Sequence, residues 1–144
     1  MDRIDIRELI TEEQLKEGYN VMRQLRSHLD EVAYLQLVNE AKRIENYRQF
    51  ALYANDKIAA VIGFQPMVTL YYGKFIWICD FVTDELKRSK GYGEQLLTYI
   101  HDLLLSEGYE TVALSSGLQR ESAHSFYKDK MKYEQVSYVF KKTL

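Results

Sequence analysis

Cysteine is almost missing from this chain of 144 residues, because Cys79 is the only one. A single thiol excludes an internal disulfide and fits a reducing compartment. Cysteine and histidine also form no cluster with the spacing of metal ligands, so we expect no metal site. Cys79 lies in an apolar run, where a free cysteine usually packs as a small hydrophobe. We favour that role over a nucleophile that forms a covalent intermediate.

Long apolar runs and a strong excess of one charge are missing too. No apolar stretch approaches the roughly 20 residues that cross a bilayer. The charged start, Met-Asp-Arg-Ile-Asp, is unlike a secretion signal. The net charge is only −2, so we expect no general basic surface that could bind nucleic acid. We therefore expect a cytoplasmic protein that binds neither membrane nor nucleic acid.

Apolar residues make up 47% of the chain, which is enough for a real core in one domain over residues 1–144. Hydrophobic periodicity and turn signals predict the order β-α-α-β-β-β-α-β-α-β. The expected elements are a strand over 4–9, a helix opened by Thr11, a helix over 30–46, strands over 50–53, 58–64 and 75–82, a helix over 94–105, a strand over 111–114, a helix over 119–130 and a strand over 138–141. The later strand-helix-strand unit supplies a parallel pair, so the fold class is α/β with a mixed sheet flanked by helices.

The loop Arg-Ser-Lys-Gly-Tyr-Gly, residues 88–93, has the composition of a phosphate site. Gly91 and Gly93 remove side chains where backbone must approach a ligand, and the helix that follows presents unpaired N–H groups. The positive end of the helix dipole, with Arg88 and Lys90, attracts an anion. A P-loop does not fit, because Gly-Lys-Ser/Thr is missing, and Leu96 replaces the third glycine of a dinucleotide fingerprint. A nucleotide-binding domain is therefore the weaker interpretation.

The spacing R-x-x-G-x-G resembles the pyrophosphate loop of the GNAT superfamily of N-acetyltransferases, which binds acetyl-CoA. The segment 114–127, Leu-Ser-Ser-Gly-Leu-Gln-Arg-Glu-Ser-Ala-His-Ser-Phe-Tyr, resembles the next GNAT block, in which a helix carries A-x-x-F-Y. With Gln24-Leu-Arg-Ser-His-Leu29, these motifs resemble a bacterial GNAT subgroup over residues 4–144. Many family members carry Asn at the position of Arg120 and Gly-Phe near 131–133, although Arg is usual in the subgroup.

This resemblance implies that parallel strands over 75–83 and 111–114 splay apart at their C-terminal ends, where acetyl-CoA binds. Backbone groups of Phe81–Thr83 would then bind the pantetheine amides, and those of Arg88–Gly93 the pyrophosphate. The residues that we assign to cofactor binding in this way are Phe81, Val82, Thr83, Arg88, Ser89, Lys90, Gly91, Tyr92, Gly93, Arg120 and Ala123.

Tyr127 and Asp80 are the candidate catalytic residues. In the family, the tyrosine of this motif commonly protonates the departing CoA thiolate, as a positioned general acid can. The alternative for Tyr127 is a role in aromatic packing only. Asp80 follows an apolar run, where a carboxylate needs a partner. It is either a proton acceptor for the incoming ammonium or an anchor for backbone or an arginine. For His124 we favour a packing or hydrogen-bonding role.

The implied activity is acetyl-CoA-dependent transfer to a primary amine, small or peptide-borne, by direct attack in a ternary complex. The alternative is a non-catalytic acyl-CoA sensor or protein-interaction module of the same fold, and a homodimer stays open. Acids and aromatics in the expected acceptor pocket favour a cationic amine over an anionic substrate, with solvated helix faces as the alternative. The residues of this expected pocket are His28, Asp30, Glu31, Tyr34, Tyr71, Tyr72 and Tyr138.

Overall fold

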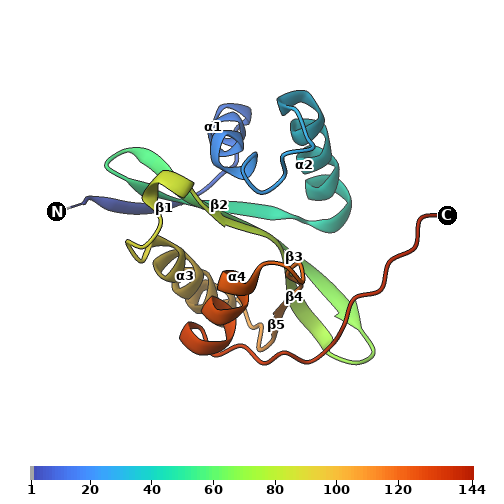
Figure 1. The fold of residues 1–144 in the computed structure, drawn as a ribbon. Helices are drawn as coiled ribbons and strands as arrows, with labels where there is room; N and C mark the ends of the chain where they lie inside the picture. Colours follow the sequence, from blue (N-terminus) through green and yellow to red (C-terminus); the bar gives the residue numbers. More distant parts are fainter. Residues whose placement is uncertain (1) are drawn as a thin grey trace. The chain divides into compact units, whose positions relative to one another are not determined.

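The computed structural model describes residues 2–144 (Figure 1). These residues form two compact units, one ending at Ala113 and one running from Leu114 to Leu144. The single domain expected over 1–144 stays a prediction. Among the described residues, no helix combines the length and the apolar character needed to cross a membrane.

The strands form one mixed sheet of five strands in the order β1-β2-β3-β4-β5. Their bounds are β1 (Ile4–Glu8), β2 (Arg48–Ala54), β3 (Lys57–Thr69), β4 (Gly73–Thr83) and β5 (Val112–Leu114). The first four pair antiparallel, whereas β5 is parallel to β4. Asn55 and Asp56 join β2 to β3 with positive φ at both residues, as a two-residue hairpin requires. The α/β fold class with a mixed sheet is confirmed.

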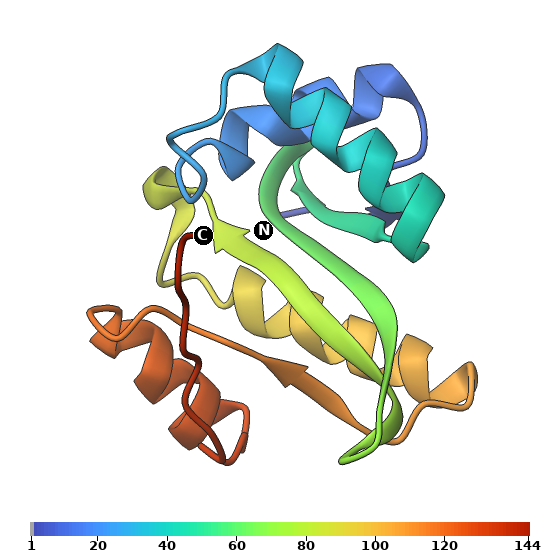
Figure 2. The same ribbon diagram turned by 90° about the vertical axis from the view of Figure 1, so that its right-hand side faces the viewer.

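Two helices cover one face of this sheet, and a third covers the other face (Figure 2). The first two are α1 (Glu12–Met22) and α2 (Glu31–Glu45), and the third is α3 (Tyr92–Ser106). Thr11 caps α1 as predicted, because its hydroxyl accepts from the Gln14 amide while the Gln14 side chain accepts from the Thr11 amide. One apolar stripe of α3 is buried, at Leu96, Leu97, Ile100 and Leu104.

The parallel pair of strands has unequal lengths. The Ile76 amide donates to the Thr111 carbonyl at 3.1 Å, so β5 starts beside the first half of β4. Because β5 has only three residues and β4 has eleven, the last residues of β4 continue beyond the end of β5. The strands are therefore parallel neighbours, as predicted, while the splay of their C-terminal ends stays a prediction.

The second unit contains α4 (Glu121–Ser125), which continues directly into a π-helical turn, η2 (Phe126–Lys130). The predicted final strand over 138–141 is wrong, since no strand is formed anywhere in residues 132–144. Tyr138 is 76% exposed and Phe140 92% exposed. The alternating apolar pattern suits a strand, but a strand forms only where a neighbour completes its hydrogen bonds.

Candidate functional site

The loop between β4 and α3 has the geometry of an anion site. Gly91 is the N-cap of α3 and has φ of 82°, a left-handed conformation that favours glycine. It carries no side chain to cap the first amides of α3, and an ideal Cβ placed on it would meet no atom within 4 Å. Tyr92 and Gly93 are the first two residues of the helix. The start of α3 therefore faces open space at Gly91, which a phosphate could occupy.

Charged side chains of both signs surround this loop. The Arg88 Nε donates to the Thr83 carbonyl at 3.3 Å, so the guanidinium folds back toward the end of β4. The Tyr92 hydroxyl donates to the Asp2 carboxylate, and this hydrogen bond holds the pKa of Asp2 below its usual range. Lys90 also acts on Asp2 by its charge. The positive groups predicted beside the loop are thus present, with one carboxylate that partly offsets them.

Strand β4 contains a β-bulge just before its last four residues. Gly63 of β3 pairs with Asp80, and the next residue, Phe64, pairs with Ile78, so Cys79 is the extra residue. The Arg26 Nη2 donates to the Cys79 carbonyl at 2.8 Å. Bulges bend a strand and redirect its side chains, often beside functional sites. The bulge therefore sets the direction of the Asp80 side chain and of the segment that follows it.

Asp80 lies in a partly buried hydrogen-bond network. Arg26 Nε donates to its Oδ1 at 2.9 Å, and the Tyr47 hydroxyl donates to its Oδ2 at 2.6 Å. Tyr47 in turn accepts from Gln49 Nε2 at 3.1 Å, and Gln49 also hydrogen-bonds to Tyr34. Burial, followed by the nearby Asp80 carboxylate, raises the pKa of Tyr47 well above its ordinary value, so its hydroxyl stays a donor. These contacts match the anchoring alternative for Asp80, and the proton-acceptor role stays a prediction.

Gly63 makes room for this network. An ideal Cβ on Gly63 would lie 1.8 Å from the Tyr47 hydroxyl oxygen and 2.5 Å from its Cζ. Real side chains do not approach so closely, so only glycine lets the Tyr47 ring reach Asp80. Nothing in the sequence around Gly63 indicates this, because Tyr47 belongs to another segment.

The segment after α1 is tied to the far end of β4. Gln24 Nε2 donates to Asp84 Oδ1 at 3.2 Å, and the Glu85 amide donates to Gln24 Oε1 at 2.9 Å. Glu85 opens η1 (Glu85–Lys87), the short 3-10 turn before the loop. Together with Arg26, Gln24 thus braces the end of β4. Sequence reasoning missed these roles, because the partners are 53 to 61 residues apart in the chain.

The last three residues of β4 differ in the direction of their backbone groups. The Asp84 amide donates to the Ala59 carbonyl of β3 at 2.8 Å. By the alternation of an antiparallel ladder, Val82 also directs its backbone groups to β3, whereas Phe81 and Thr83 direct theirs to the opposite edge. A backbone contact with pantetheine therefore suits Phe81 and Thr83 better than Val82.

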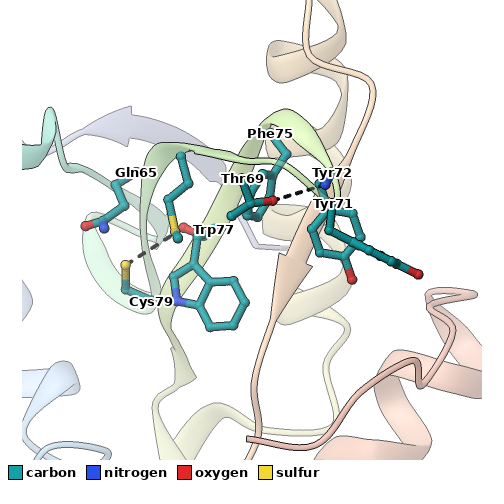
Figure 3. Close-up of a pocket in the computed structure, with 8 residues that line it drawn as sticks. Gln65, Thr69, Tyr71, Tyr72, Phe75, Trp77 and Cys79 are labelled. Carbon is teal, nitrogen blue, oxygen red and sulfur yellow. Dashed lines mark hydrogen bonds between the residues drawn. The ribbon is translucent and has the colours of Figure 1, made fainter.

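A pocket of about 510 Å³ lies on the hairpin formed by β3 and β4 (Figure 3). Most of its lining is aromatic or sulfur-containing: Met67, Tyr71, Tyr72, Phe75, Trp77 and Cys79. The rest is polar but uncharged, from Gln65 and Thr69. The pocket is widely open to solvent, and its lining has the apolar character that small-molecule sites share.

This pocket contains only part of the expected acceptor site. Tyr71 and Tyr72 line it, as expected. Tyr34 is instead buried in the core, where its hydroxyl donates to Gln49. Asp30 is the N-cap of α2 and accepts from the Ala33 amide at 2.8 Å. The acids on which the expectation of a cationic amine depended are therefore absent from the pocket wall.

Cys79 lies at one end of this pocket, and its thiol is poorly ionised. Burial, and then the adjacent Asp80 carboxylate, raises the pKa of Cys79 to about 12. The thiolate is the reactive form, so a nucleophilic role has no support near neutral pH. The structure thus agrees with the preference for a packing role.

We expect Cys79 to resist alkylation near neutral pH. At pH 8 iodoacetamide should label the folded chain at least about a hundredfold more slowly than the unfolded chain, because little thiolate exists below the raised pKa. The rate should climb steadily between pH 9 and pH 12. Since Cys79 is the only cysteine, the mass of the intact chain reports its labelling directly. Rapid labelling at pH 7 would contradict the buried-thiol description.

In the second unit, Tyr127 lies in η2 among other aromatic rings. Its ring is 5.5 Å from that of Phe126 and 5.7 Å from that of Tyr133, and its carbonyl accepts from the Tyr133 amide at 2.8 Å. Burial raises the pKa of Tyr127, although the charge of Arg120 opposes this shift. The hydroxyl therefore keeps its proton near neutral pH, which is the state that a general acid needs.

His124 organises the start of α4. Its Nε2 lies 2.8 Å from the Gly117 carbonyl oxygen, which also accepts from the Arg120 amide at 3.0 Å. The hydrogen-bonding role expected for His124 is confirmed. Arg120 is the N-cap residue of α4, and Ala123 lies within that helix. Their cofactor contacts stay predictions.

No group of three or more His, Cys, Asp or Glu side chains is placed to hold a metal ion within residues 2–144. The first unit thus contains two candidate sites, a loop with the geometry of an anion site and an uncharged aromatic pocket, and the Asp80 network lies on β4. In the second unit, the candidate catalytic residue is the buried Tyr127, whose pKa is raised.

Comparison with known proteins identifies the family. The model of the acetyltransferase (GNAT) family matches residues 7–133. A protein of Bacillus subtilis strain 168, named "Uncharacterized N-acetyltransferase YhdJ", is 44% identical over 139 residues, which cover 96% of this chain and 98% of that one. The chain belongs to the GNAT family of acetyltransferases, as the motifs predicted.

Solved structures share the fold at low sequence identity. An aminoglycoside N-acetyltransferase, AAC(6')-Iy in complex with CoA, has a TM-score of 0.85 and 14% identity, covering 99% of this chain and 96% of that chain. A GNAT family acetyltransferase of Staphylococcus aureus subsp. aureus USA300_TCH1516 has a TM-score of 0.78 and 20% identity, covering 100% of both chains. These similarities confirm the GNAT fold.

Proposed function

We propose that this acetyltransferase uses acetyl-CoA and transfers the acetyl group to a primary amine by direct attack in a ternary complex. The observation that supports this most strongly is the β4–loop–α3 unit, in which the left-handed Gly91 leaves the helix start open beside Arg88 and Lys90. Family membership supports the class of reaction, and the open helix start supports our proposal that the pyrophosphate binds there.

In the proposed reaction, the loop and β4 bind acetyl-CoA and Tyr127 acts as the general acid. Bound acetyl-CoA supplies the activated acetyl group. The loop amides hold its phosphates, and Phe81 and Thr83 offer backbone groups to its pantetheine arm. Holding both reactants in place removes much of the entropic barrier. Tyr127 gives a proton to the departing sulfur.

Asp80 is proposed to take the proton of the incoming ammonium, directly or through water. Its two oxygens already accept from Arg26 and Tyr47. A carboxylate has about four lone-pair directions, so these two hydrogen bonds leave capacity for a further donor. The two donors also hold the carboxylate in one orientation, as a positioned base requires.

Two measurements test this proposal together. Calorimetry should show that the full chain binds CoA, and a thiol-release assay with acetyl-CoA should show turnover with a panel of primary amines. Binding without turnover on any amine would favour the alternative, a non-catalytic acyl-CoA sensor. The absence of both heat and thermal shift at millimolar CoA would overturn the proposal.

Replacing Gly91 with valine is expected to abolish detectable CoA binding while the chain stays folded. The protein itself leaves space for the side chain, but φ of 82° disfavours valine, and the added carbons would occupy the place of the phosphate. Calorimetry with CoA measures the loss, and the circular dichroism spectrum checks the fold.

Gly108→Val is the matched control for Gly91→Val. Gly108 follows the C-terminal end of α3 and has φ of 94°. As at Gly91, an ideal Cβ on Gly108 would meet no atom within 4 Å. It should show a similar loss of stability from backbone strain with unchanged CoA affinity. Equal loss of CoA binding in both variants would mean that strain in α3, and not the loop, explains the effect.

A further inference from the structure

We infer that the pocket on the β3–β4 hairpin binds the body of the acceptor, and that this acceptor is a primary amine on a flat aromatic body. The inference rests on the proposed acetyl transfer and adds the chemical class of its second substrate. The pocket lies wholly within the first unit, on the face of the hairpin that carries Trp77 and Cys79 (Figure 3).

The lining determines the class of ligand. Tyr72 and Trp77 present rings, with the buried Phe75 ring behind them. Met67 and Cys79 present sulfur, and none of the lining residues carries a charge. Rings favour a flat partner that can stack or meet them edge to face. A ligand with several cationic groups would find no carboxylate in the wall and would lose hydration without compensation. An aromatic amine therefore fits better than an aliphatic polyamine.

The aromatic wall is largely formed before any ligand arrives. The ring centroids of Tyr71 and Tyr72 are 4.8 Å apart, and those of Tyr72 and Phe75 are 5.0 Å apart. The Tyr72 amide donates to the Thr69 hydroxyl at 3.0 Å, which holds the turn that carries both tyrosines (Figure 3). Because Tyr72 already packs between Tyr71 and Phe75, its ring loses little side-chain freedom when a flat aromatic ring binds.

The position of the pocket along β4 sets where the amine lies. Cys79 ends the pocket, and Phe81, whose backbone is a predicted acyl-CoA contact, is two residues further on, about 7 Å at the rise of an extended strand. A ring beside Trp77 and Cys79 with an amine on an arm of two or three carbons would point that amine along β4. Asp80 is the residue between Cys79 and Phe81 in the strand, and its carboxylate accepts from Arg26 and Tyr47.

Trp77 offers a direct test, because it is the only tryptophan of the chain. Its fluorescence should change saturably when 2-phenylethylamine is added to the full chain. The diamine 1,5-diaminopentane should bind at least about tenfold more weakly, as expected from the loss of ring contacts. In the thiol-release assay with acetyl-CoA, the same order should appear in kcat/KM.

Two variants localise the binding. Tyr72→Leu keeps an apolar side chain but removes a ring of the wall, and it should weaken binding of 2-phenylethylamine about tenfold. Tyr99→Leu removes a half-exposed ring from α3, on the other face of the sheet, and should leave binding unchanged. Equal weakening in both variants would overturn the assignment.

The outcomes separate this inference from the proposed function. If the chain responds to 2-phenylethylamine but does not bind CoA, the pocket binds aromatic amines and the proposed acetyl transfer is wrong. Turnover with 1,5-diaminopentane but not with 2-phenylethylamine would keep the transfer and reject the aromatic acceptor. If Trp77 fluorescence depends on protein concentration and does not change with either amine, a second copy of the chain binds this face. That result would also contradict the aromatic acceptor.

Discussion

Replacing Gly63 with alanine is expected to lower the free energy of unfolding by about 3 kcal/mol, the sum of overpacking and a strained buried hydrogen bond. The new Cβ would lie 1.8 Å from the Tyr47 hydroxyl oxygen, and the ring cannot retreat without leaving Asp80. Urea unfolding followed by circular dichroism measures the change. Because Gly63 pairs with Asp80, whose carboxylate accepts from Tyr47, thiol-release turnover should fall as well.

Two further variants show whether the clash with Tyr47 is the cause. In the Tyr47→Phe background, Gly63→Ala should be less damaging but still harmful, since the Cζ of residue 47 would remain 2.5 Å from the new Cβ. Gly73→Ala, at φ of 72° with nothing within 4 Å, should show only the smaller effect of backbone strain, about 1 kcal/mol. If Gly63→Ala is no worse than Gly73→Ala, the close approach does not matter to stability.

Tyr127→Phe is expected to reduce thiol-release turnover about a hundredfold or more, the usual contribution of a positioned general acid. CoA affinity should change little, because the hydroxyl is proposed to act only as the sulfur departs. The raised pKa predicts that the wild-type acid stays protonated beyond the ordinary tyrosine value of 10.0, so its ionisation should not limit the rate at pH 9. Steady-state kinetics and calorimetry with CoA measure the two effects.

Tyr133→Phe is the matched control for this residue. Tyr133 is a neighbouring ring, 5.7 Å from Tyr127, and it lies outside the A-x-x-F-Y motif. Removing the Tyr133 hydroxyl should leave turnover nearly unchanged. Unchanged turnover in Tyr127→Phe itself would show that Tyr127 serves only in packing.

Sequence alone was sufficient for the order of elements up to α4 and for the family. The Thr11 cap is a local signal, since it depends on residues within a few positions. The R-x-x-G-x-G loop is likewise contiguous, so its place between β4 and α3 could be predicted. The family followed from motifs of the same local kind, and the comparisons confirmed it.

Tertiary structure decided the rest, because those features depend on segments that are distant in the chain. The predicted strand over 138–141 had a suitable pattern but found no partner, and a pattern cannot supply one. The requirement for glycine at position 63 arises only because the Tyr47 ring packs there, and the roles of Gln24 and Arg26 arise only because β4 ends beside them. The uncharged pocket replaced the expected acidic one for the same reason: folding placed Asp30 at a helix cap and gathered the rings of β3 and β4 on one face.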